Sequence, residues 1–180
     1  MCELKIYSVS DRYIEYLRAE NSNVYSNKVE NRVHTRKYVG VVIEIADYKY
    51  YIPMSSPKNT DYQMAGGQKV IKKSIVPIIR IVVKNSKGEK ELKGTLRISH
   101  MIPVPESELE LFDLDNEMDM EYKDLVQNEV IFIRKNCKKI ISNAQLLYKQ
   151  KKNGDQTAGY VKTALDYISL EKLCDDYITG

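Results

Sequence analysis

Apolar and polar positions alternate along the first hundred residues, and this period of two predicts mainly β-strands. The strand-like segments are residues 3–9, 38–45, 48–54, 74–84 and 91–102. Ala46 and Asp47 form the turn that joins the second and third segments into a predicted hairpin. Pro77 marks its segment as an edge or bulged strand, because proline donates no hydrogen bond to a sheet.

The second half of the chain changes to the three- and four-residue spacing of amphipathic helices. One long helix is expected from about Asp119 to Lys152, with Gly154 ending it. Its predicted buried positions are Leu125, Ile133, Cys137, Ile140, Ala144 and Leu147. A last helix is expected to bury Val161, Leu165, Ile168 and Leu173.

Two shorter helices are predicted as well. Ser8 or Ser10 is expected to cap the first, in which Tyr13, Ile14 and Leu17 share one face. The second is a single helical turn within residues 106–114. Residues 19–36 are predicted to form a long loop, and residues 59–73 are a second polar stretch.

These elements predict an α+β fold: a small twisted antiparallel sheet or partly open barrel, with a long C-terminal helix and additional helices packed on it. A length of 180 residues favours one domain, residues 1–180. The chain has neither a run of about 20 apolar residues nor an apolar leader, which favours a cytoplasmic protein without membrane contact. Three widely spaced cysteines, Cys2, Cys137 and Cys174, are expected to stay reduced.

The net charge of +3 hides a segregation of charge along the chain. Residues 106–129 contain ten acids and one lysine, whereas residues 130–152 contain seven bases and no acid. Such blocks fit either a solvated helix face or a field that attracts a charged partner.

Several kinds of catalytic site are poorly supported by this sequence. It contains no GxGxxG, GxxxxGK[ST], GxSxG or HExxH motif. Its two histidines, His34 and His100, lie far apart, which argues against a multi-histidine metal site. We therefore expect no metal and no cofactor, and we expect His100 to be a satisfied residue of the sheet.

The turn Ser55-Ser56-Pro57-Lys58 is the strongest candidate site. It follows the second strand of the hairpin and places two hydroxyls and an ammonium within four residues. Pro53 and Pro57 restrict its backbone. A rigid cationic turn of this kind is suited to holding a phosphate group.

The order of these features resembles the endoribonuclease toxins of type III toxin–antitoxin systems, the ToxN/AbiQ family. The hairpin with its Ser-Ser-Pro-Lys turn is the most specific part of the resemblance. The matching segments are Lys5–Val9, Tyr13–Leu17, Arg36–Ile45, Tyr50–Lys58, Ile98–Pro105 and Val130–Asn136.

The resemblance implies a metal-independent endoribonuclease related to the compact barrel toxins that cut mRNA. Attack by the RNA 2′-OH is expected to leave 2′,3′-cyclic phosphate and 5′-OH ends. A small repeat RNA antitoxin, trimmed by the toxin from a longer precursor, is expected to inhibit it within a cyclic protein–RNA assembly. Cellular or phage RNA would be the substrate, and phage defence by abortive infection or growth arrest the outcome.

By position, the resemblance assigns catalytic roles to six residues. Ser56 matches the key serine, Ser55 the hydroxyl before it and Lys58 the lysine that closes the motif. The cation before the second strand is Arg36, with Lys37 adjacent, and a tyrosine of the first helix is Tyr13. The cations would stabilise the charged phosphorane and the serines would orient the phosphate. A lysine with a lowered pKa, Tyr13 or His34 remains a candidate for proton transfer.

Further residues are expected to bind RNA. Arg32 stands where some relatives carry a tyrosine, and His34 in the same segment is an alternative for that role. The remaining predicted RNA-binding residues are Lys28, Arg134, Lys135, Lys138 and Lys139.

Two other functions stay open at this point. A non-catalytic RNA-binding regulator on a small barrel would share the basic surface. A protein-interaction module would instead pair residues 106–129 of one copy with residues 130–152 of another.

Overall fold

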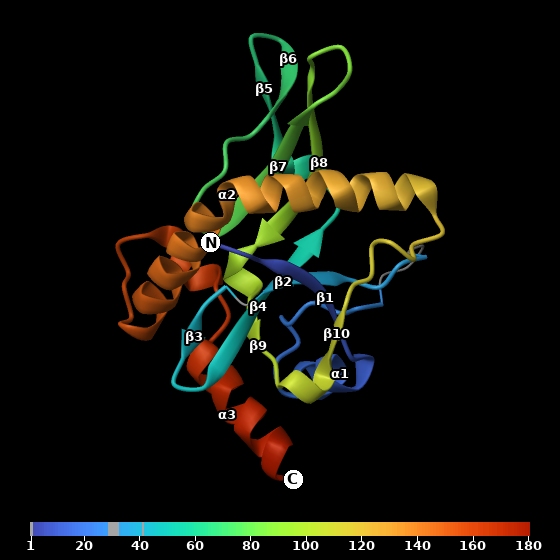
Figure 1. Cartoon of the computed structure of the whole chain (residues 1–180). Coiled ribbons are helices and arrows are strands. Elements are labelled where there is room, and N and C mark those ends of the chain that lie inside the picture. The colour runs from blue at the N-terminus through green and yellow to red at the C-terminus, as the bar shows by residue number, and fades with distance from the viewer. Residues whose placement is uncertain (1, 29–32, 41) are drawn as a thin grey trace.

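The computed structural model describes residues 2–28, 33–40 and 42–180, and its centre is an open antiparallel sheet (Figure 1). Neighbouring strands follow the order β10-β1-β2-β4-β8-β7, with β3 and β9 also paired to β4. Because β10 and β7 are its two edges, the described sheet does not close into a barrel. The strands are β1 (Lys5–Val9), β2 (Lys37–Gly40), β3 (Glu44–Ile45), β4 (Tyr48–Ser55), β7 (Ile78–Lys84), β8 (Lys90–Arg97), β9 (Ile102–Pro103) and β10 (Leu109–Leu111).

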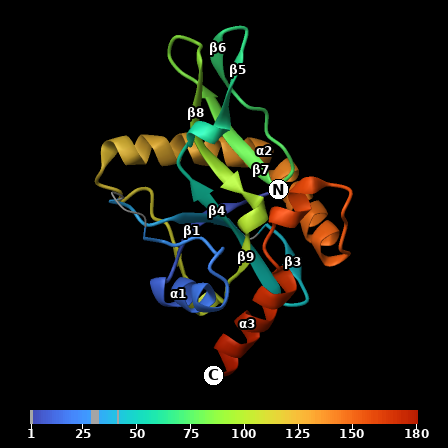
Figure 2. The ribbon, with the colours of Figure 1, turned by 180° about the vertical axis from the view of Figure 1, so that it is seen from behind.

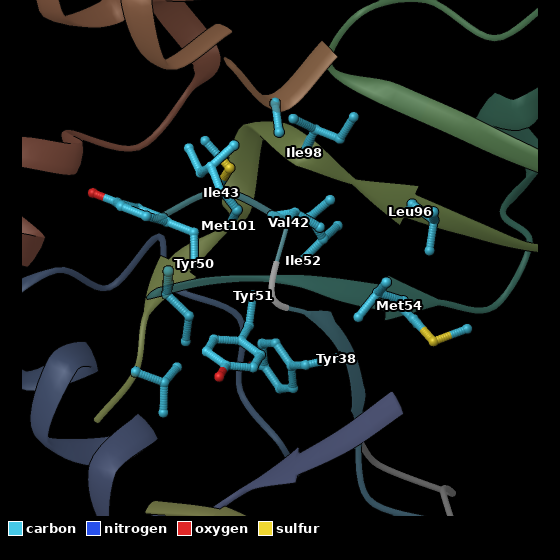
Figure 3. Close-up of a cluster of buried hydrophobic side chains, with 14 of the residues drawn as sticks. Tyr38, Val42, Ile43, Tyr50, Tyr51, Ile52, Met54, Leu96, Ile98 and Met101 are labelled. Atoms are coloured by element: carbon cyan, nitrogen blue, oxygen red, sulfur yellow. The ribbon is translucent and has the colours of Figure 1, made fainter. Parts of the chain in front are cut away.

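Strand β4 is central because it pairs with β2, β3, β8 and β9. Its side chains pass through the hydrophobic core, where Tyr50 and Ile52 are fully buried (Figure 3). The predicted hairpin is confirmed: Tyr38 lies opposite Pro53 in one half and Glu44 opposite Lys49 in the other. Its turn has two residues with positive φ, which is the conformation that matches the twist of a tight hairpin.

In the described part of the chain, three α-helices pack around this sheet: α1 (Asp11–Glu20), α2 (Met120–Lys152) and α3 (Tyr167–Thr179). Two views of the chain show α2 lying across one face of the sheet (Figures 1 and 2). Helices α1 and α3 lie at the end opposite the tip formed by β5 (Tyr62–Ala65) and β6 (Gln68–Ile71). Ser10 caps α1, as predicted, by accepting a hydrogen bond from the Tyr13 amide. None of the helices in the described ranges is long and apolar enough to span a bilayer.

The long helix is confirmed, and Asp119 is its N-cap. Five of the six predicted core positions are buried, from Ile133 to Leu147. Leu125 is only half-buried, and its neighbour Val126 takes the buried position.

Three local predictions are wrong or incomplete. Residues 106–114 form a short 3₁₀ turn, η3 (Glu106–Glu108), and then strand β10, because β1 offers a free edge for pairing. The polar stretch at residues 59–73 contains a second hairpin, β5 (Tyr62–Ala65) and β6 (Gln68–Ile71). The last helix begins only at Tyr167, so Val161 and Leu165 are buried before it, and Ile168 is exposed.

The expectation of three reduced cysteines is also wrong. Cys2 is joined to Cys137 of α2 by a disulfide, with 6.2 Å between the two Cα atoms. Cys174 is a free, buried thiol, and burial raises its pKa. No local pattern in the sequence indicates the bridge, because its two ends are 135 residues apart and meet only when the residues before β1 reach α2.

Replacing Ile140 by Ala is expected to lower the free energy of unfolding by about 2–5 kcal/mol, because its fully buried side chain would leave a cavity under α2. Urea denaturation measures the loss. Ile131→Ala on the same helix is the matched control, since Ile131 is 52% exposed and its variant should stay within about 0.5 kcal/mol of the wild type. Equal losses in the two variants would contradict this packing.

Candidate active site

The Ser-Ser-Pro-Lys turn begins at the end of β4, where Ser55 lies opposite Thr95 of β8. A short 3₁₀ turn, η1 (Asn59–Asp61), follows it and brings a carboxylate back to the turn. The Lys58 amide donates to Asp61 Oδ2 over 2.9 Å, which fixes the backbone that carries Lys58.

Asp61 is completely buried and faces two arginines of the sheet. Arg80 of β7 donates from Nε to Asp61 Oδ1 over 3.1 Å, and Arg97 of β8 approaches Oδ2 within 3.4 Å. Both guanidinium groups are themselves buried. One carboxylate therefore faces two fixed positive charges and neutralises only one of them, so this group of three side chains keeps a net positive charge.

Arg36 holds the opposite side of the turn. Its guanidinium donates to the Met54 carbonyl over 2.7 Å and to Ser55 Oγ over 2.9 Å, and its Nε donates to the Ser26 carbonyl. The predicted cation and one predicted serine are thus brought together, with Arg36 almost wholly buried. Ser56 and Lys58 are the exposed residues of the turn.

The ring of Tyr25, from the loop after α1, contacts three side chains of this site. The Arg36 guanidinium lies 4.8 Å and the Lys58 ammonium 5.8 Å from the ring centroid. The imidazole of His100 stacks on the same ring with 4.2 Å between centroids and 19° between planes. We call Tyr25, Arg36, Ser55, Lys58 and His100 the β4-end cluster.

The sequence predicts His100 to be a satisfied residue of the sheet, whereas the structure places it in this cluster. It ends the short turn η2 (Ile98–His100), and its Nδ1 lies 2.9 Å from Ser99 Oγ. Burial first, and then the charges of Arg97, Lys58 and Arg36, lower the pKa of His100 to about 4. At neutral pH its imidazole is therefore uncharged.

A cavity of about 310 Å³ opens on the α2 side of the turn. Ser55 and Ser56 line it together with Lys37 and His34. Lys37 does not join Arg36, because neighbouring residues of an extended chain point to opposite faces. Its ammonium donates to Ser8 Oγ over 3.1 Å and lies 4.7 Å from the Phe112 ring centroid, and burial lowers its pKa.

His34 is held at the other end of this cavity. Its ring stacks on Tyr122 of α2 at 3.7 Å, and its Nε2 lies 3.2 Å from Asp119 Oδ2. It therefore flanks the serines but stands apart from the β4-end cluster.

The structure places Tyr13 in the hydrophobic core. The side chain is completely buried, and its hydroxyl donates to the Pro103 carbonyl over 2.7 Å. Burial raises its pKa, and its ring packs on Tyr16 and Tyr177. Because a substrate could not reach this hydroxyl, Tyr13 is removed from the candidate site.

The predicted RNA-binding residues occupy two surfaces. Lys28 is exposed on the loop after α1, and Arg32 lies outside the described residues. Four exposed bases follow one another along α2: Arg134, Lys135, Lys138 and Lys139. In the part of the chain that the structure describes, no three His, Cys, Asp or Glu side chains are grouped to hold a metal ion.

Comparison with known proteins gives a consistent set of similarities. A family model described as Toxin ToxN, type III toxin–antitoxin system, matches residues 5–175. Endoribonuclease ToxN of Pectobacterium atrosepticum is 31% identical, over 80% of this chain and 79% of that protein. Endoribonuclease AbiQ of Lactococcus lactis subsp. lactis is 30% identical, over 93% of this chain and 86% of that protein.

Solved structures agree with these sequence similarities. One describes selective toxin inhibition by a non-coding RNA pseudoknot in type III systems; its TM-score is 0.78 at 26% identity, and 99% of each chain is covered. Another is AbiQ, a lactococcal anti-phage endoribonuclease of the type III class, with a TM-score of 0.77 at 27% identity over 98% of this chain and 99% of that one.

Replacing Asp61 by Asn is expected to lower the free energy of unfolding by about 3–5 kcal/mol, because Arg80 and Arg97 would then be buried charges without a counter-charge. Chemical denaturation measures this loss. The control is Glu91→Gln, which removes the exposed partner of Lys93 and should cost at most about 1 kcal/mol. If Asp61→Asn were as mild as the control, the carboxylate would not be the anchor of the turn.

Proposed function

Because this chain belongs to the ToxN family of type III toxin–antitoxin toxins, we propose that it is an endoribonuclease whose active centre is the β4-end cluster with Ser56. The observation that carries the proposal is the meeting of Arg36, Ser55 and Lys58 at one end of β4. The relatives named endoribonucleases support the class of reaction.

RNA supplies its own nucleophile, so the enzyme must orient the phosphate, stabilise the added negative charge and move two protons. The exposed Ser56 hydroxyl and Lys58 ammonium are proposed to bind the non-bridging phosphate oxygens. Arg36 is proposed to hold Ser55 and to add a buried positive charge. These cations provide charge stabilisation without a metal ion, and the products would carry 2′,3′-cyclic phosphate and 5′-OH ends.

The cavity beside the turn is proposed to hold the nucleoside next to the cleaved bond. Its volume of about 310 Å³ leaves room for a base and ribose. His34 would contribute an aromatic edge, and Lys37 would contribute a positive charge at the cavity wall.

A small repeat RNA is proposed as the inhibitor of this toxin. A solved relative is described as inhibited by a non-coding RNA pseudoknot, and AbiQ as an anti-phage enzyme. By the same logic, this chain would trim its antitoxin from a precursor, assemble with it in a closed complex and act in phage defence. The exposed bases of α2 would bind RNA phosphates without regard to sequence.

Ser56→Ala and Lys58→Ala are each expected to reduce RNA cleavage by about 10²–10³-fold, because each removes one group that stabilises the transition state. Cleavage of a labelled RNA in excess EDTA, with analysis of the product ends, measures both the loss and the chemistry. The matched control is Lys172→Ala on α3. Helix α3 contacts Tyr48, the first residue of β4, through Asp175, and Tyr48 is roughly 20 Å from Ser55 for a strand of this length.

Three outcomes separate the alternatives. Cleavage that disappears in EDTA would remove the metal-independent mechanism. Tight RNA binding by the wild type without any cyclic phosphate product would favour the non-catalytic RNA-binding regulator. Undiminished cleavage by both variants would exclude the proposed centre.

Replacing Lys138 and Lys139 of α2 by Gln is expected to weaken RNA binding and to flatten its salt dependence. For single-stranded RNA, every phosphate that these lysines no longer neutralise should reduce the slope of log K against log salt by about 0.7. Affinity measured over a series of salt concentrations tests this, with Lys172→Gln as the control. An unchanged slope would place the RNA elsewhere.

A further inference from the structure

The proposed reaction requires a group that accepts the proton of the 2′-OH. Serine hydroxyls are far too weakly acidic to ionise near neutral pH, and arginine stays protonated, so neither suits the role. Tyr13 is enclosed in the core, and His34 is engaged by Tyr122 and Asp119. Lys37 is held by Ser8 and the Phe112 ring.

We propose that His100 is this proton acceptor, an inference that rests on the proposed endoribonuclease function. His100 stacks on Tyr25, whose ring also lies next to the Arg36 guanidinium and the Lys58 ammonium. The imidazole therefore shares one neighbour with Lys58, which would bind the scissile phosphate, and with Arg36, which would add a positive charge beside it. A group in this position is suited to the ribose attached to that phosphate.

The orientation of the ring leaves one nitrogen for this purpose. Nδ1 lies 2.9 Å from Ser99 Oγ, so this side of the ring is occupied. Stacking on Tyr25 covers a face of the imidazole, whereas the lone pair of Nε2 lies in the ring plane at its edge. Within the described ranges, no hydrogen bond engages Nε2 of His100.

The charged neighbours of His100 come from three elements. Arg97 ends β8, Lys58 closes the turn after β4, and Arg36 precedes β2. Tyr25, from the loop after α1, is the titratable group on the ring face. The carboxylate of Asp61 is bound to Arg97 and Arg80. The surroundings thus hold His100 in its neutral form, the form that accepts a proton.

Substrate binding is expected to strengthen this base. Burial and then three cations lower the pKa of His100 in the free protein, and a bound phosphate adds a negative charge among those cations. The pKa of His100 should therefore rise above about 4 when RNA binds, by the part of the shift that the cations cause. His100 would therefore become a stronger base only when the reacting phosphate is bound.

Two bonds and two protons change in the proposed step. Nε2 takes the 2′-OH proton while O2′ forms a bond to phosphorus, and the phosphorus–O5′ bond breaks. O5′ takes a proton from the Lys58 ammonium or from water, which gives the 5′-OH and the 2′,3′-cyclic phosphate. The proton on His100 then returns to the solvent, and the donor regains its own.

His100→Gln and His100→Asn are expected to lower kcat by about 10²–10⁴-fold with RNA affinity kept within about threefold. Gln places an amide near the Nε2 position and Asn one near Nδ1, so Asn retains a partner for Ser99 while neither titrates. Circular dichroism and thermal unfolding check the fold of both variants. In the wild type, kcat/KM should rise with pH through a limb near pH 4, which reports the free enzyme, and this limb should be lost in both variants.

A substrate with sulfur in place of the bridging O5′ separates a base from an acid. A thiolate leaves without needing a proton, so this substrate rescues the loss of an acid but not the loss of a base. Both His100 variants should therefore remain slow on it. Recovery of the rate would make His100 the acid and would overturn the inference.

NMR titration of the His100 ring gives a readout that does not depend on turnover. Binding of an oligonucleotide with 2′-deoxyribose at the cleaved position should raise the pKa of His100, and Lys58→Gln should raise it in the free protein. A pKa that moves in neither experiment contradicts the proposed site.

The outcomes of these experiments distinguish the two levels of proposal. If the wild type cleaves no RNA, the proposed function fails and this inference fails with it. If the wild type cleaves and His100→Gln cleaves equally well, only the inference is overturned. A pH limb that is lost in Lys37→Gln and kept in His100→Gln would assign the proton to Lys37 instead.

Discussion

The interaction on which the site depends most is the buried carboxylate of Asp61. It binds the Lys58 amide and two arginines, Arg80 and Arg97, from adjacent strands. A buried charge of this kind is stable only when its partners surround it, so the turn after β4 and the ends of β7 and β8 must adopt their positions together. The exposed serine and lysine gain their fixed backbone from an interaction that lies entirely beneath the surface.

The same arrangement suits the charge stabilisation that the proposed mechanism requires. Two of the three cations around His100, Arg36 and Arg97, are buried and held by the backbone or by neighbouring side chains, so little reorganisation is needed when a phosphate arrives. Lys58 remains exposed, so in the proposed mechanism its charge would be the first to contact the RNA. The hydrophobic core around β4 holds the strand rigidly, and the proposed catalytic groups lie on the polar segments at its end.

Local periodicity explains what could be predicted from the sequence. The hairpin around Ala46 and Asp47 and the helix from Asp119 carry their signals within a few residues, and both are confirmed. Strand β10 has only three residues, too few for a period, and its pairing with β1 is a long-range event. The β5–β6 hairpin did carry a turn signal, Gly66-Gly67 with positive φ, but its polar flanks concealed the strands.

The site was predicted less completely because it is assembled from distant segments. The resemblance assigned Ser55, Lys58 and Arg36 by position, and the structure brings them together. His100 and Tyr25 were missed, since nothing near either residue in the sequence indicates that the two rings stack. Side chains alternate between the two faces of an extended chain, so Lys37 could have been predicted to point away from Arg36. Tyr13 shares an apolar helix face with Ile14 and Leu17, so its burial could have been predicted as well.

The bridge between Cys2 and Cys137 gives the molecule a covalent topology that the fold alone does not have. It closes about three quarters of the chain, including each of the described strands and the whole β4-end cluster, into a single ring. After Cys137, the end of α2 and the segments that follow it lie outside the covalent ring. A peptide bond cut in the loop that carries Tyr25 would therefore open the ring without releasing a fragment, and the two sides of the cut would remain one molecule.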